Sequence, residues 1–145
     1  MANVKAEKFQ KFIDENKVLG FAVQEEKDKL NTVLFRGTLS VAKQVLPIVV
    51  AVDDSVYTLI QVQLSSTASE GALEKILPYL NKLNLAYKCF KYSVIENGPV
   101  LLTVSIPSSG DYFDSTLVFS LIMQTITPHL EAEYPLLMKA IWGKA

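Results

Sequence analysis

The residue types that most often do chemistry are scarce in this sequence. His129 is the only histidine and Cys89 the only cysteine among 145 residues. A catalytic triad or a Cys-His pair would have to use His129, and no nucleophile motif accompanies it. A zinc site needs several nitrogen or sulfur ligands, which one histidine and one cysteine do not supply. We therefore expect no catalytic residue and no metal site, and we interpret His129 as an exposed residue in the first helical turn after Pro128.

Cys89 stands in a stretch where residues alternate as they do in a strand, with Phe90 and Tyr92 nearby. This pattern predicts that Cys89 is a small, half-buried apolar residue of that strand. The alternative is an exposed thiol whose pKa the neighbouring Lys88 would lower. A single cysteine excludes an intrachain disulfide, which suits a reducing compartment.

Two polar motifs resemble ligand sites but are better explained as loops. Residues 108–111 precede a predicted helix, where the carboxylates of Asp111 and Asp114 would repel an anion while either could cap the helix. Asp53 and Asp54 are followed by a serine and form a compact turn with too few carboxylates for a cation site. We expect no cofactor at either place.

Composition is typical of a globular protein, and we expect one domain over residues 1–145. Half of the residues are hydrophobic, and the 14 basic and 15 acidic residues give a net charge of −1. This balance offers no clustered basic surface for nucleic acid. Phe90 and Tyr92 are therefore interpreted as core residues rather than as a platform on which bases stack. The most apolar stretch, 113–126, is too short and interrupted to span a bilayer, and residues 1–16 lack the apolar centre of a signal peptide. We expect a cytoplasmic protein that binds neither membrane nor nucleic acid.

Hydrophobic periodicity predicts an α+β fold with the order α-β-β-β-β-α-β-β-α. Apolar residues recur at helical spacing over 3–16, 67–84 and 114–142, and at every second position over 21–64 and 89–107. The short connections within residues 21–64 favour an antiparallel meander.

Individual residues predict where elements start, stop or deform. Asn3 can cap the first helix, and residues 67–70 match a capping box for the second. Asn97-Gly98 is typical of a type I′ hairpin turn. Pro47 favours the start of a strand or an irregularity, and Pro78 a kink in the second helix. Thr127-Pro128 predicts that the last helix breaks and restarts.

The sequence has more apolar residues than a core on one face of the sheet can bury. Residues 45–52 are apolar at every position, which predicts a central strand covered on both faces. Residues 117–126 are apolar almost all round, which predicts a central position or a partner chain. An apolar patch that the chain itself leaves uncovered indicates an interface, and we expect one on this sheet. The alternative is that the first and last helices cover both faces of the sheet within one chain. The candidate contact residues are Val49, Ala51, Tyr57 and Leu59.

Three segments carry a resemblance to a known family. They are Leu34-Phe-Arg-Gly-Thr-Leu39 through Leu46-Pro-Ile-Val-Val50, then Tyr57-Thr-Leu-Ile-Gln-Val-Gln-Leu64, and Leu80-Asn-Lys-Leu-Asn84 leading into Asn97-Gly98 and Pro99-Val-Leu-Leu-Thr103. With the order of elements, they make residues 18–142 similar to the type III secretion chaperone-like fold, and specifically to the YbjN-like family of sensory transduction regulators. The resemblance implies a bacterial homodimer that binds another protein on an exposed sheet or helix surface. It supplies no catalytic residue, and this nearly neutral chain departs from the many acidic members.

These observations favour a non-catalytic protein-binding or regulatory module that is homodimeric. The alternative is a small-molecule sensor with an apolar pocket between the C-terminal helix and the sheet. Phe113, Phe119 and Met123 would line that pocket.

Overall fold

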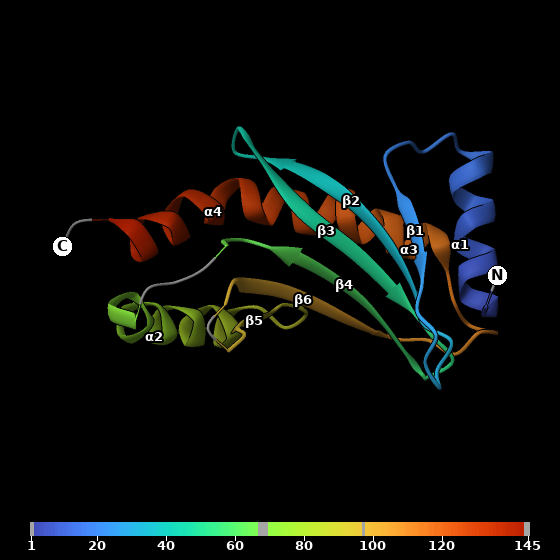
Figure 1. Ribbon diagram of the computed structural model, residues 1–145. Coiled ribbons are helices and arrows are strands. Elements are labelled where there is room, and N and C mark those ends of the chain that lie inside the picture. The colour runs from blue at the N-terminus through green and yellow to red at the C-terminus, as the bar shows by residue number, and fades with distance from the viewer. Residues whose placement is uncertain (1, 67–69, 97, 144–145) are drawn as a thin grey trace.

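The structure is a computed structural model that describes residues 2–66, 70–96 and 98–143. In these ranges the chain forms one six-stranded antiparallel sheet in the order β1-β2-β3-β4-β6-β5, and helices pack against it (Figure 1). The elements follow the order α-β-β-β-β-α-β-β-α, which confirms the predicted α+β fold. The strands are β1 (Ala22–Glu25), β2 (Val33–Val41), β3 (Gln44–Val52), β4 (Tyr57–Gln63), β5 (Lys91–Val94) and β6 (Val100–Pro107), and the helices are α1 (Val4–Glu15), α2 (Glu70–Ala86), α3 (Ser115–Ser120), the π-helical η1 (Leu121–Ile126) and α4 (Thr127–Trp142).

Helix α1 begins at Asn3, whose side chain also ties the helix to the sheet. The Oδ1 atom of Asn3 accepts a hydrogen bond from the Ala6 N–H at 2.8 Å, the N-cap arrangement that the sequence predicts. Its Nδ2 donates to the carbonyl of Val52 at 3.1 Å. The buried Phe9 then meets Phe35 of β2 edge-on, with ring centroids 4.9 Å apart. The apolar side of α1 therefore closes one end of the core.

Strands β2 and β3 form the longest hairpin of the sheet. Ala42 and Lys43 connect them with φ values of 48° and 64°, as a two-residue type I′ turn requires. Pro47 lies within β3 opposite Thr38 rather than at the strand start, so that part of the prediction is wrong. The pairing of β3 with β4 extends only to Ile48, so Pro47 lies just beyond it.

The last three helical segments are continuous from residue 115 to residue 142. Asp114 caps them through its Oδ1 atom, which accepts from the Leu117 N–H. Helix α4 begins at Thr127 with Pro128 in its first turn, which confirms the predicted restart, but the chain does not break there. Both the N–H and the hydroxyl of Thr127 donate to the carbonyl of Ile122, five residues earlier. These wider π-helical hydrogen bonds extend the helix up to Pro128, which has no backbone N–H to donate to a hydrogen bond.

Helix α2 places Ile76, Leu80 and Leu83 in the core and contains Pro78. It continues to Ala86, two residues beyond its predicted end. The predicted capping box at residues 67–70 begins outside the described residues, and the turn residue Asn97 also lies outside them.

The helices that the structure describes lie on one face of the sheet, and in Figure 1 the C-terminal helix runs behind the strands. The prediction that residues 45–52 are covered on both faces is wrong, as is the alternative that helices cover both faces. Leu46, Ile48, Val50 and Val52 are buried, whereas Val45, Pro47, Val49 and Ala51 are partly or fully exposed. The first and last helices pack on the same side, so the second apolar face of β3 remains uncovered.

The C-terminal helix lies on the sheet rather than in the centre of the protein. Leu117 and Leu136 on this helix remain about half exposed. Among the described residues, no helix combines the length and hydropathy that crossing a membrane requires.

Candidate interaction surface

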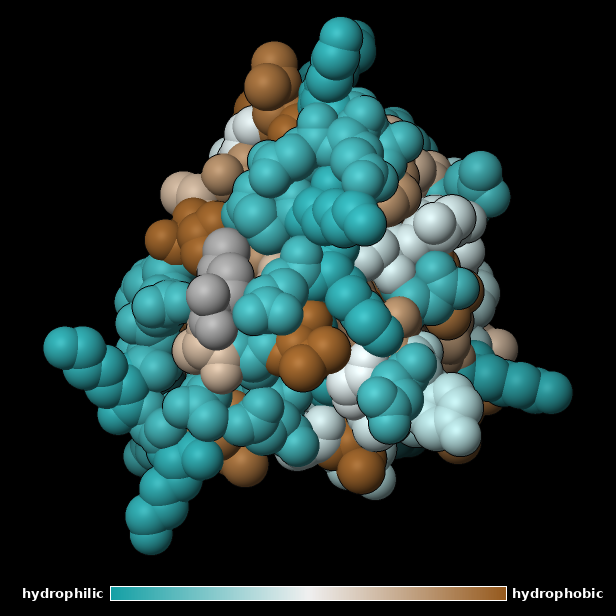
Figure 2. All heavy atoms as spheres, turned by 90° about the vertical axis from the view of Figure 1, so that its right-hand side faces the viewer, coloured by the Kyte–Doolittle hydropathy of each residue, from teal (hydrophilic) through white to brown (hydrophobic). Residues whose placement is uncertain are grey.

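The uncovered face of the sheet consists of alternate strand residues, and we call it the open face. Strand pairing fixes the neighbours on it: Ala51 lies between Leu34 and Leu59, and Val49 lies between Arg36 and Gln61. The side of the molecule that carries α1 differs from the open face. Figure 2 shows the side on which α1 lies as mainly hydrophilic, with hydrophobic residues in small groups.

All four predicted contact residues lie on the open face. Ala51 and Leu59 are direct cross-strand partners, and Val49 is in the next row of the sheet. Tyr57 begins β4 opposite Pro107 and is 54% exposed. The sequence placed these residues on one surface because side chains in a strand alternate between faces.

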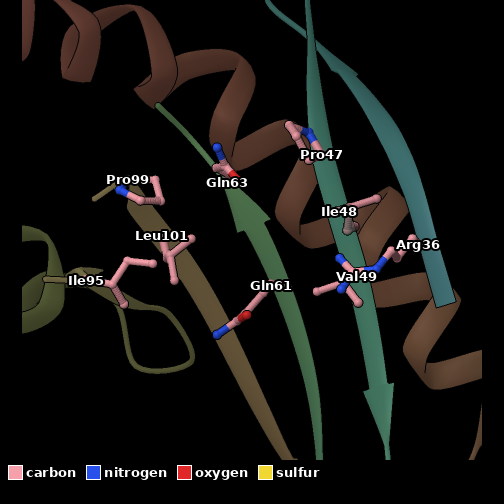
Figure 3. Close-up of a pocket in the computed structure, with 9 residues that line it drawn as sticks. All are labelled: Arg36, Pro47, Ile48, Val49, Gln61, Gln63, Ile95, Pro99 and Leu101. Carbon is pink, nitrogen blue, oxygen red and sulfur yellow. The ribbon is translucent and has the colours of Figure 1, made fainter. Parts of the chain in front are cut away.

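A hollow of about 220 Å³ lies in the open face. In Figure 3, Ile95, Pro99 and Leu101 lie along one side of it and Arg36, Pro47 and Val49 along the other, with Gln61 and Gln63 between them. Sequence reasoning named Val49 alone among these as a contact residue. The signal that could have found Arg36, Gln61 and Gln63 is strand alternation, which puts them on the side opposite the core residues of their strands.

The strand residues of the open face include two cations and no carboxylate. Arg36 and Lys91 lie in one cross-strand row and are separated in it by Val49, Gln61 and Thr103. The Nε atom of Arg36 donates to Oε1 of Gln24 at 3.0 Å. Among the described residues, the one ion pair within 4.0 Å is on α1, so the guanidinium of Arg36 has no carboxylate partner.

A buried lysine fixes the turn that leads into the open face at Tyr57. Lys5 is only 2% exposed, and its Nζ donates to the carbonyls of Ser55 and Tyr57 at 2.9 and 3.0 Å. Burial lowers the pKa of Lys5, while Asp53 and Asp54 act in the opposite direction. Sequence reasoning missed this contact because a lysine near a helix start is normally exposed.

His129 lies in a half-buried aromatic cluster, so the prediction of an exposed residue is wrong. Its ring centroid is 4.5 Å from that of Tyr87 and 4.3 Å from that of Phe90. The hydroxyl of Tyr92 lies 2.5 Å from Nε2 of His129. Burial lowers the pKa of His129, although Glu133 opposes this, and burial raises the pKa of Tyr92. At neutral pH the phenol is therefore protonated and the imidazole neutral, so neither partner of this hydrogen bond carries a charge.

Cys89 is exposed in the connection between α2 and β5, so the prediction of a half-buried strand residue is wrong. The physical reason is that β5 begins only at Lys91, after a bend. Among the described residues, no three His, Cys, Asp or Glu side chains could hold a metal ion together.

A second hollow, of about 210 Å³, lies between the C-terminal helix and the sheet. Phe119 and Met123 line it, as predicted for an apolar pocket, together with Ile122 and Leu39. Phe113 does not, because it is buried in the core with its ring centroid 6.3 Å from that of Phe9.

Comparison with known proteins assigns no family. No protein-family model matches the sequence, and no curated protein matches it.

Proposed function

We propose that this protein is a non-catalytic protein-binding module that holds another polypeptide on its open face. The resemblance to YbjN-like proteins supports a regulatory role for this binding. The single observation that carries the proposal is the uncovered face, where Ala51 and Leu59 adjoin with no helix over them. A polypeptide seated there would form the second layer that a sheet with two apolar faces requires.

Homodimerisation is a separate part of the proposal. The resemblance to YbjN-like proteins supports it, and so do Leu117 and Leu136, which remain about half exposed on the C-terminal helix. Light scattering over a range of concentrations tests this part. A monomer at every concentration would contradict it without affecting the open face.

The binding proposal is tested by affinity capture from the native host, with the captured protein identified and then purified for rebinding. Leu59→Glu places a charge on the open face, whereas Leu85→Glu places the same charge on α2 at a position that is 80% exposed. We expect the wild type and Leu85→Glu to bind the partner stoichiometrically and Leu59→Glu to lose it. Equal binding by both variants would contradict the proposal.

A second candidate function is the sensing of a small apolar molecule. The observation that favours it is the 210 Å³ hollow lined by Phe119 and Met123. That volume is below the range of about 300–1,000 Å³ for drug-sized ligands, so the ligand would be a short alkyl chain or a single ring.

Filling the hollow tests this second candidate. Met123→Trp would occupy it, and Leu117→Trp is a matched control because Leu117 is similarly exposed on the same helix but does not line the hollow. Native mass spectrometry should find a bound small molecule in the wild type and in Leu117→Trp but not in Met123→Trp. A ligand retained by Met123→Trp would exclude this site.

A further inference from the structure

We infer that the polypeptide held on the open face is an extended segment of a different protein, which places a carboxylate beside Arg36 and apolar side chains over Val49 and Leu101. This inference rests on the proposed function and adds the chemistry of the partner. It follows from the charges and the shape of the hollow in Figure 3.

The charge of the face favours an acidic partner. Arg36 lines the hollow, and its guanidinium has no carboxylate partner among the described residues. Lys91 lies in the same cross-strand row, and no strand residue of the open face is acidic. Guanidinium groups bind carboxylates through paired, charge-assisted hydrogen bonds, so a carboxylate is the group that fits there.

The same charges argue against a second copy of this chain on the face. A face-to-face dimer would bring together two copies of Arg36 and two of Lys91 with no strand carboxylate between them. Covering a guanidinium without a counter-charge is strongly unfavourable. The carboxylate of Glu26, just beyond β1, accepts from Gln24 rather than from Arg36 itself. Asp53, Asp54 and Glu96 lie in the connections at the strand ends rather than on the strands.

The residues that line the hollow with Arg36 indicate which other groups the bound polypeptide segment presents. Val49, Leu101, Ile95 and Pro99 supply apolar contacts on both sides of the hollow. The amide of Gln63 lies between them and can bond to a passing backbone. Strands β3 and β4 already have neighbours on both sides, so the segment is recognised by side chains rather than by strand addition.

Synthetic peptides provide the direct test. The probe is a capped peptide of alternating valine and glutamate, compared with peptides that carry glutamine or lysine in place of glutamate. Fluorescence anisotropy should show binding of the glutamate peptide alone. Arg36→Gln should weaken that binding about tenfold, the size of one charge-assisted hydrogen bond. Arg36→Glu should instead bind the lysine peptide.

Lys11→Gln is the matched control, because Lys11 is a cation on α1, away from the open face, with a side chain that is 76% exposed. It should bind the glutamate peptide as the wild type does. Equal binding of the three peptides, or an equal loss in Lys11→Gln and Arg36→Gln, would overturn the inference.

Binding of the natural partner to the two variants distinguishes a failure of this inference from a failure of the proposed function. If Leu59→Glu loses the purified partner and Arg36→Gln keeps full affinity, the open face binds protein but the acidic partner is wrong. A wild-type dimer that Leu59→Glu converts to a monomer would assign the face to a second copy and overturn the inference. If Leu59→Glu keeps full affinity, the proposed function itself fails.

Discussion

The hydroxyl oxygen of Tyr92 lies 2.5 Å from Nε2 of His129, where β5 meets α4. Burial lowers the pKa of the imidazole and raises that of the phenol, so both groups are uncharged at neutral pH. Tyr92 donates this hydrogen bond when the proton of the neutral imidazole is on Nδ1. This contact joins the edge strand to the C-terminal helix. Its strength therefore depends on the protonation state of His129.

We expect the free energy of unfolding to fall as the pH falls through 6.5. The pKa of His129 is below 6.5 in the folded protein, so the unfolded chain takes up the proton first and is favoured in that window. Urea titrations between about pH 8 and about pH 5.5, above most carboxyl pKa values, measure the effect. His129 is the only histidine, so His129→Gln should give a flatter profile. An identical slope in that variant would contradict the assignment.

Asn84→Ala should loosen β5. The side chain of Asn84 donates to the carbonyl of Tyr92 at 3.0 Å and accepts from its N–H at 2.7 Å, as a neighbouring strand would. Loss of both bonds should reduce the free energy of unfolding by about 1 kcal/mol. Hydrogen exchange should show faster exchange of the Tyr92 amide, while Asn84→Asp, which keeps the acceptor, should protect it. Unchanged exchange in Asn84→Ala would contradict this prediction.

Lys5→Ala should reduce the free energy of unfolding by about 2–4 kcal/mol. The substitution removes a buried side chain and its hydrogen bonds to the carbonyls of Ser55 and Tyr57, of which Tyr57 keeps only the longer bond from the Ser55 hydroxyl at 3.3 Å. Lys11→Ala changes the same residue type on the same helix at an exposed position. It should change stability by no more than about 0.5 kcal/mol. Chemical denaturation of both variants checks the difference, and equal effects would show that the Lys5 contacts contribute nothing.

Tyr79→Phe should reduce the free energy of unfolding by about 1–3 kcal/mol at neutral pH. The hydroxyl of Tyr79 donates to Oε1 of Glu133, a residue that is only 9% exposed and would lose this donor. Burial, with Glu133 adding to it, raises the pKa of Tyr79 above its ordinary value of 10. Above that pH the unfolded chain therefore releases its proton first, and the wild type should lose stability as the pH rises.

The Tyr79→Phe variant should lose less stability than the wild type over that alkaline range. Tyr112→Phe removes a hydroxyl from a residue that is 83% exposed, and it should match the wild type at both neutral and alkaline pH. Urea titrations at neutral pH and above pH 10 compare the three proteins.

Periodicity predicted the fold and the membership of the open face. Residues Val56 to Leu64 alternate in the sequence, and Thr58, Ile60 and Val62 are buried while Leu59 and Gln61 are not. Because side chains point to opposite faces at every step of a strand, this part of the site follows from local chemistry alone. Asn3 and Asp114 were equally predictable, since a cap bonds to residues of its own helix.

The features that the sequence did not predict depend mainly on contacts between segments that are distant in the chain. An all-apolar strand such as residues 45–52 has two faces that helices could cover, and the sequence does not say where the helices pack. The surroundings of Lys5 and His129 come from residues far along the chain, Ser55 in one case and Tyr92 in the other. Cys89 was assigned to a strand that begins two residues later, an error in an element boundary.

The two-residue turn at Ala42 and Lys43 has a consequence for the order of folding. It connects nine consecutive residue pairs between β2 and β3, so the first of these pairs forms with very little loop-closure entropy and the rest can follow one after another. Pairing of β4 with β6 must instead wait for the ends of a long loop containing α2 and β5 to meet. The β2–β3 hairpin is therefore the natural folding nucleus, and substitutions in it should slow refolding, whereas substitutions in β6 should mainly speed unfolding.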